Sequence, residues 1–201
     1  MKEGGITVRC YQLTFEKGEM LGVSDDYLDA LHDSDECPTE HLELLLDLIL
    51  DPLYENYGCN YLAMSMERGG RTGRTHLHAY VQMAYPVQSM TAWHKMYHGV
   101  HVEVCKGTPD QNMDYLAKAG KWLNDVKHGT LKWGPIGWGE MTGGGAGSLE
   151  EYIELLDRGW RYEQLIRAYP QSLRYSYGLI KFEDRINKQK RLEKKKHDSD
   201  D

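Results

Sequence analysis

The segment 60–83 constrains the fold more than any other part of the chain, because its pattern predicts two strands joined by a short turn. "NYLAMSME" (60–67) and "THLHAYVQM" (75–83) are rich in residues that favour β-strands, and "GGRTGR" (69–74) lies between them. Two such runs around a glycine-rich connection are typical of a β-hairpin. The segment therefore predicts two neighbouring antiparallel strands.

The remaining pattern alternates between strands and helices. Further strands are predicted over 6–15 and 100–105, with a short closing strand in 129–134. Helices are predicted over 24–36, 38–57, 86–99, 108–122, 148–159, 161–170 and 171–192. In the fourth of these, Thr108 is the expected N-cap, and a proline follows it at the first helical position. We expect an α+β fold with an antiparallel sheet up to about residue 135 and a helical appendage after it.

Composition limits the class of protein. The chain has 201 residues, which suits one domain of ordinary size or a domain with an appendage. No two of its four cysteines form a CxxC pair, and their spacing favours reduced, packed thiols in a reducing compartment. No apolar signal segment opens the chain, and the most apolar run is too short and acidic to span a bilayer. We expect a soluble, intracellular protein that is not secreted.

The charge of the chain is segregated. Residues 1–60 carry 14 Asp and Glu against 3 Lys and Arg, a net charge of −11, out of −7 for the whole chain. Residues 61–150 carry 7 against 9, and residues 151–201 carry 10 against 12, so each of these parts has a net charge of +2. A basic working face opposite an acidic back remains compatible with nucleic-acid binding.

Two histidines stand one residue apart in the predicted strand 75–83. Residues i and i+2 of a strand point to the same face, so His76 and His78 present two imidazoles side by side. A pair of histidines without a ligand is the alternative, because such short motifs recur by accident. Glu67 ends the partner strand of the hairpin and can lie across from them. Two imidazoles and one carboxylate with open positions suit Mg²⁺ or Mn²⁺ better than a closed structural zinc.

A second candidate pair is Tyr115 and Lys118 in "DYLAK". On a helix these two residues share a face. Alone, the pair is more typical of a half-buried tyrosine beside a surface lysine. Beside a metal site it acquires a chemical interpretation, in which the phenol attacks phosphorus and the metal neutralises developing charge. The lysine would orient the phosphate or favour the phenolate.

These motifs together resemble the replication initiator (Rep) endonucleases of the HUH superfamily from circular single-stranded DNA viruses. "YQLTF" (11–15) resembles the first family motif, "HLHAYVQ" (76–82) the His-hydrophobe-His motif, and "YLAK" (115–118) the YxxK motif with the catalytic tyrosine. Glu67 stands where such proteins often carry an acidic metal ligand. The 39 positions from His76 to Tyr115 (115 − 76) and the segment after the linker also resemble circovirus-like members.

The resemblance implies a fold of about five antiparallel strands flanked by helices, like the RRM or ferredoxin-like fold, as the HUH endonuclease domain in 1–140. A glycine-rich linker at 141–147, a helical segment at 148–192 as a candidate oligomerisation region, and a charged tail at 193–201 would follow. The family usually continues into a superfamily 3 helicase, and this chain has no GxxxxGK[ST] loop, so a helicase is expected only in a longer parent protein. The resemblance implies the host nucleus for a virus of eukaryotes, and otherwise the cytoplasm.

The implied activity is metal-dependent nicking and joining of single-stranded DNA at a stem-loop origin. Tyr115 would hold the 5′ phosphate and release a 3′-OH for rolling-circle replication. The expected DNA contacts are Tyr11, Gln12, Thr14, Arg68, Arg71, Arg74 and Trp93, the arginines on phosphates and an aromatic on a base. The alternative for the arginines is a solvated hairpin end. The alternatives are a non-enzymatic single-strand-binding module, a metal-dependent phosphodiesterase that uses water, and a scaffold with incidental histidines.

Overall fold

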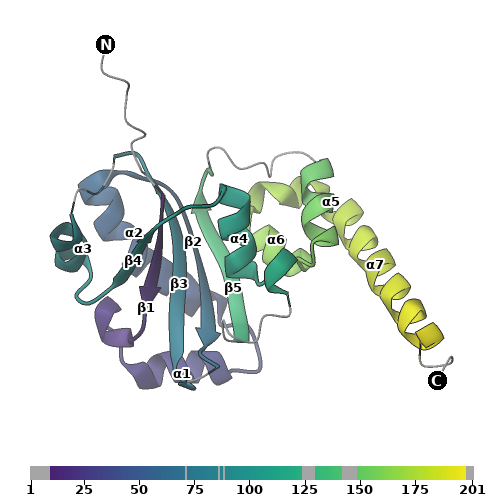
Figure 1. Cartoon of the computed structure of the whole chain (residues 1–201), viewed down its shortest axis with the longest axis horizontal. Coiled ribbons are helices and arrows are strands. Elements are labelled where there is room, and N and C mark those ends of the chain that lie inside the picture. The colour runs from purple at the N-terminus through teal and green to yellow at the C-terminus, as the bar shows by residue number, and fades with distance from the viewer. Residues whose placement is uncertain are drawn as a thin grey trace, which may run out of the picture.

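One antiparallel sheet of five strands organises the molecule (Figure 1). The computed structural model describes residues 10–70, 72–85, 87, 89–123, 130–141 and 149–197. The strands are β1 (Cys10–Phe15), β2 (Cys59–Arg68), β3 (Thr75–Met83), β4 (His101–Val104) and β5 (Thr130–Gly139). Their order in the sheet is β4-β1-β3-β2-β5, and all neighbouring pairs are antiparallel. The predicted α+β class and the antiparallel sheet are confirmed.

Three helices cover one face of this sheet: α1 (Asp25–Asp33), α2 (Thr39–Tyr57) and α3 (Met90–Met96). The burial of β1 explains this coverage, because its side chains alternate between the two faces of the sheet. Tyr11, Leu13 and Phe15 are buried towards the helices, whereas Gln12 and Thr14 are only half-buried on the other face. The apolar stripe of α2, which includes Leu45, Ile49 and Leu53, belongs to the same buried cluster. This first core leaves the opposite face of the sheet for the site.

The opposite face is partly covered by α4 (Pro109–Ala117), α5 (Leu149–Asp157) and α6 (Tyr162–Ala168). Tyr61 and Tyr80 from the sheet are buried there with Leu116 of α4, Leu155 of α5 and Leu165 of α6. The sheet, α4 and the helices after residue 149 therefore share one continuous second core. In Figure 1, α4 and α6 lie together beside β5.

The helix boundaries correct several expectations. The helix expected over 86–99 begins at Met90, where the Ser89 side chain accepts a hydrogen bond from the Ala92 backbone. The helix expected over 108–122 ends at Ala117, and a 3-10 turn, η2 (Gly120–Trp122), follows it.

A further difference occurs near the C-terminal end of the chain. The region 171–192 contains the end of another 3-10 turn, η4 (Pro170–Tyr175), and then α7 (Ser176–His197). The expected tail at 193–201 is thus helical to residue 197. Residues 6–9 of the first predicted strand, residues 142–147 of the linker and residues 198–201 lie outside the described residues.

Helix α7 continues away from the two cores towards the C-terminus, as Figure 1 shows. Tyr177 and Ile180 are exposed on it, while Leu179 is buried. Within the described ranges, no helix combines the length and the apolar character that crossing a membrane requires.

Candidate metal and tyrosine site

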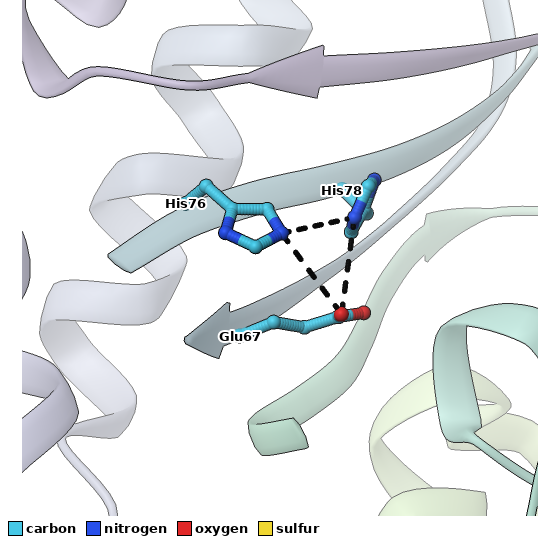
Figure 2. Close-up of side chains that lie close together, drawn as sticks. All are labelled: Glu67, His76 and His78. Carbon is cyan, nitrogen blue, oxygen red and sulfur yellow. Dashed lines mark hydrogen bonds and ion pairs between the residues drawn. The ribbon is translucent and has the colours of Figure 1, made fainter. Parts of the chain in front are cut away.

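The register of the hairpin brings the three predicted ligands together. Glu67 of β2 pairs with His76 of β3, and the next pair on the same face joins Ser65 to His78. The Nε2 atoms of the two imidazoles are 3.1 Å apart. Glu67 Oε2 lies 4.0 Å from Nε2 of His76 and 3.8 Å from Nε2 of His78. Figure 2 shows the three side chains converging on one point from two adjacent strands.

Both imidazoles are oriented by contacts on their far nitrogens. Nδ1 of His76 lies 3.2 Å from the backbone oxygen of Arg74. A carbonyl oxygen only accepts hydrogen bonds, so Nδ1 must donate, and Nε2 of a neutral ring is left with a lone pair facing the site. Nδ1 of His78 lies 3.1 Å from the hydroxyl oxygen of Thr14 on β1. Such contacts behind a histidine are typical of metal ligands, whose rings need a fixed orientation.

Glu67 is an unusual residue to bury, and its exposed fraction is 0%. Burial raises the pKa of this carboxyl to about 7, although the nearby Lys118 ammonium lowers it. The Lys118 Nζ is 2.7 Å from Glu67 Oε1, which leaves Oε2 on the histidine side. Oε2 lies 3.8–4.0 Å from the Nε2 atoms of the two histidines. A buried charge is costly unless it is paired or coordinates a metal, so this oxygen is suited to a cation.

The donor set fits one divalent ion. One ligand atom from each of the three residues falls within 4.8 Å of the others. Ligand atoms at about 2.1 Å from one ion and at right angles to each other lie about 3 Å apart, close to the separation of the two imidazole nitrogens. The set of one carboxylate and two imidazoles leaves open positions, which distinguishes it from a closed structural zinc site.

Tyr115 projects from α4 towards this cluster. Its hydroxyl oxygen lies 3.4 Å from Nε2 of His78, and the two rings meet edge to face at 5.3 Å. Burial raises the pKa of the phenol, and the charges of Glu67 and Glu103 raise it further. The phenol is therefore protonated near neutral pH, and any reaction as a nucleophile must remove that proton.

Lys118 reaches the site by a different route from the predicted one. It is not one turn further along the helix, because α4 ends at Ala117 and Lys118 is its C-cap in the left-handed conformation, with φ 50°. From there its Nζ lies 3.8 Å from the centre of the Tyr115 ring and also pairs with Glu67. The expected proximity of the two residues holds, while the reason given for it, a shared helix face, is wrong.

The position of α4 is set at both of its ends. At the start, Thr108 forms the predicted cap as part of a capping box with Gln111. Near the end, the buried Asp114 accepts hydrogen bonds from the Arg158 guanidinium and from the indole nitrogen of Trp160. The segment after residue 149 thus holds the helix that carries Tyr115.

The expected DNA contacts on β1 and α3 lie on opposite faces of the sheet. Gln12 and Thr14 lie on the face of the site and line a pocket of about 560 Å³ beside Tyr115. Tyr11 and Trp93 are 5% and 2% exposed, and their rings pack against each other at 5.0 Å in the first core. Neither ring can stack on a base in this conformation, so that expectation is corrected.

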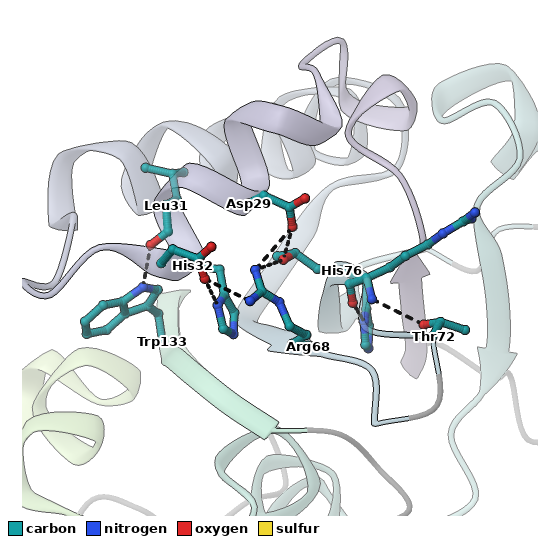
Figure 3. Close-up of polar contacts among 10 residues, drawn as sticks. Asp29, Leu31, His32, Arg68, Thr72, His76 and Trp133 are labelled. Atoms are coloured by element: carbon teal, nitrogen blue, oxygen red, sulfur yellow. Dashed lines mark hydrogen bonds and ion pairs between the residues drawn. The ribbon is translucent and has the colours of Figure 1, made fainter.

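The three arginines of the hairpin end differ in their surroundings. The Arg68 guanidinium pairs with Asp33 at 2.9 Å and with Asp29 at 3.4 Å, both on α1 (Figure 3). Its contacts tie the hairpin to the acidic helix. Arg74 is exposed, and Arg71 lies outside the described residues.

Several site residues were not predicted. The pocket beside Tyr115 is also lined by Glu103, Lys106, Asn112, Lys121 and Trp122. The Trp122 ring lies 5.2 Å from the Tyr115 ring. The available signal was the glycine in "AKAGKW", which follows the YxxK motif and marks a break in the helical pattern before Trp122; in the structure this glycine begins η2 with φ 54°.

Comparison with known proteins assigns this chain to no family. No protein-family model matches the sequence, and no curated protein matches it.

Proposed function

We propose that this protein nicks and rejoins single-stranded DNA through a covalent bond between Tyr115 and a 5′ phosphate, as a replication initiator of the HUH type. One observation carries the proposal: the Tyr115 hydroxyl lies 3.4 Å from a nitrogen of His78, which belongs to the Glu67–His76–His78 cluster. A phenol at the edge of a three-ligand metal site suits nucleophilic attack on a phosphodiester.

The topology supports the HUH-type fold within the wider α+β class. From β1 to β4 the chain alternates as strand, helices, strand, strand, helix, strand. The corresponding sheet order is β4-β1-β3-β2, with β5 added at the β2 edge. This order supports a βαββαβ pattern of the ferredoxin-like type, to which the RRM sheet is similar. The neighbouring strands β3 and β2 of that sheet carry the cluster.

The proposed step exchanges one phosphodiester for another. The Tyr115 oxygen bonds to phosphorus, the bond between phosphorus and the 3′ oxygen of the preceding nucleotide breaks, and the phenolic proton ends, in the overall balance, on that 3′ oxygen. No oxidant or nucleotide is consumed. The same exchange in reverse, with a 3′-OH as the attacking group, rejoins the strand and closes a circle.

Each residue of the site has a separate role in the proposed step. Glu67, His76 and His78 would hold Mg²⁺ or Mn²⁺, which supplies positive charge to a non-bridging phosphate oxygen. Lys118 places its ammonium over the Tyr115 ring and beside Glu67, so it favours the phenolate and fixes the carboxylate. The ring contacts with His78 and Trp122 orient the phenol.

The substrate we propose is single-stranded DNA presented by a stem-loop origin, and oligomerisation would use the segment 148–192. Two other functions share part of the geometry. A binding module would use the pocket and the basic side chains without reaction. A phosphodiesterase that uses water would need the metal ligands and not Tyr115. The closeness of the phenol to the cluster favours the covalent reaction.

A gel assay separates these functions. The protein is mixed with Mn²⁺ and a pool of stem-loop oligonucleotides whose loop is randomised and whose 3′ end is labelled. The proposal predicts a labelled species that migrates as a protein–DNA adduct on a denaturing gel and disappears with EDTA. Shorter labelled DNA without an adduct would indicate hydrolysis by water, and unchanged DNA that is bound in a native gel would indicate a binding module. Either result would contradict the proposal.

A further inference from the structure

The proposed cleavage step assigns no role to the pocket next to Tyr115. It has a volume of about 560 Å³ and is formed by β1, β4, the start of α4 and η2. This volume falls within the range of small-ligand sites, about 300–1,000 Å³. Tyr115 and His78 are part of its lining, so whatever it binds lies directly beside the reacting groups.

One side of the pocket is aromatic and cationic. Trp122 and Tyr115 form the aromatic wall, with their rings at 5.2 Å. Lys121 and Lys106 are exposed at the rim, and Glu103 adds one negative charge on the β4 side. The Lys121 Nζ also lies 4.7 Å from the centre of the Trp122 ring, an exposed contact that a stacked base can replace. An aromatic wall with a cationic rim suits a base attached to a phosphate.

Gln12, one of the residues that line the pocket, carries a buried hydrogen-bond acceptor. The Gln12 Nε2 donates to Asn112 Oδ1 at 3.3 Å, and Gln12 Oε1 is buried with no hydrogen-bond partner among the described residues. The Asn112 amide nitrogen donates to the backbone oxygens of Gly107 at 3.2 Å and Thr108 at 2.8 Å. Those two carbonyls fix the orientation of the Asn112 amide, which in turn fixes that of Gln12.

A buried acceptor without a donor is costly, so the pocket favours a ligand that brings an N–H group. Exocyclic amino groups of cytosine and adenine present such a donor, whereas thymine carries a carbonyl oxygen in the position of the cytosine amino group. A carbonyl oxygen placed against Gln12 Oε1 would leave two acceptors facing each other.

We propose that the pocket binds one unpaired base of the DNA strand beside the cleaved phosphate and selects bases with an exocyclic amino group through Gln12 Oε1. Trp122 supplies the stacking surface, and Asn112 holds the Gln12 amide in the orientation that reads the base. The location of the cleaved phosphate rests on the proposed function, while the chemistry of the pocket does not. The pocket gives the site a sequence preference that phosphate contacts alone lack.

The test compares oligodeoxycytidine with oligodeoxyuridine of equal length, because uracil has nearly the size of cytosine and, like thymine, carries a carbonyl oxygen in the position of the cytosine amino group. Binding of each fluorescent oligonucleotide to the full chain is measured by anisotropy in EDTA. We expect oligodeoxycytidine to bind roughly 3- to 10-fold more tightly, the effect of about one hydrogen bond. In Gln12→Met this ratio falls to about one, whereas Trp122→Leu weakens the binding of both oligonucleotides. The control Asn60→Met changes an exposed amide on β2 and should keep the ratio.

Equal affinities for the two oligonucleotides, no measurable binding of either, or a preference that persists in Gln12→Met would overturn the inference. Its failure is distinguishable from failure of the proposed function. An adduct in Mn²⁺ without a base preference in EDTA rejects the pocket and leaves the nicking activity. A base preference that depends on Gln12, without any adduct, rejects the nicking activity and leaves the pocket.

Discussion

Each histidine of the cluster is held by a different neighbour, and this decides which nitrogen a metal would meet. His76 is fixed by a backbone oxygen in the hairpin turn, and His78 by the Thr14 hydroxyl of the neighbouring strand. Both Nε2 atoms therefore face the buried Glu67. Orientation of this kind lowers the ordering cost of binding an ion, since the rings need not search for their positions.

The first prediction concerns His78→Ala. We expect this change to weaken Mn²⁺ binding by more than about 100-fold, because a direct ligand contributes more than the contacts behind it. The matched control is His101→Ala, which removes an exposed imidazole from the same face of the sheet. Isothermal titration with Mn²⁺ measures both variants. Equal weakening by the two substitutions would contradict the assignment of the cluster.

The surroundings of individual aromatic residues could not be predicted from the sequence. Tyr11 and Trp93 were expected to contact DNA, and both are buried in the first core. Trp122, which lines the pocket, follows the helix that carries Tyr115. The sequence does not say which side of a short helix faces the sheet, and a 3-10 turn breaks the periodicity from which such a side is predicted.

At the scale of elements, the end of α4 determines the position of the Lys118 ammonium. A left-handed C-cap is normally glycine or asparagine, because other side chains meet a steric cost there. Here lysine occupies that conformation, with φ 50°, and its side chain turns back over Tyr115 and towards Glu67. The left-handed backbone of Lys118 therefore places its ammonium at the site. Two substitutions can separate the effect of the backbone conformation from that of the charge.

The second prediction compares Lys118→Gly with Lys118→Ala. Both remove the ammonium, so we expect both to reduce nicking to a similar extent. Only glycine suits the left-handed backbone, so Lys118→Gly should be more stable than Lys118→Ala by about 1 kcal/mol in the free energy of unfolding. Urea denaturation measures the difference. An alanine variant as stable as the glycine variant would contradict the left-handed cap.

Several elements were predictable because their local signals agree with the final fold. The strand 75–83 has the bounds that were expected, and the capping residues of α4 locate its start. The closing strand is longer than expected, since β5 spans Thr130–Gly139 and its pattern contains glycines and a proline that lower its apparent strand character. The ion pairs of Arg68 with α1 were not predictable, because they join residues far apart in the sequence.

At the scale of the whole molecule, the helices after residue 149 complete the site indirectly. Arg158 and Trp160 hold the buried Asp114 of α4, and the Gly120 backbone nitrogen donates to the Arg158 backbone oxygen at 2.8 Å. Leu155 and Leu165 share the second core with the sheet. The segment that was expected to be an appendage is therefore connected with the helix that bears the proposed nucleophile.

The third prediction follows from this connection. Arg158→Met keeps most of the length of the side chain and removes the partner of a buried carboxylate, so it should lower the free energy of unfolding by about 1–3 kcal/mol. Nicking should also fall, because α4 loses one of its anchors. Chemical denaturation and the gel assay measure the two effects. As a control, Arg167→Met on α6 should change both by much less, and an equal effect of the two variants would argue against the anchoring role.

The central claim concerns the atom that takes up the DNA, and mass spectrometry of the trapped adduct tests it most directly. The adduct formed with Mn²⁺ is digested, and the tyrosine that carries the nucleotide is identified among the 14 in the chain. We predict that it is Tyr115 and that Tyr115→Phe reduces adduct formation by at least about 10³-fold, because it removes the attacking oxygen and keeps the ring. Tyr54→Phe, an exposed tyrosine on α2, should leave the yield unchanged. Nucleotide found on another tyrosine, or a full yield of adduct from Tyr115→Phe, would contradict the account.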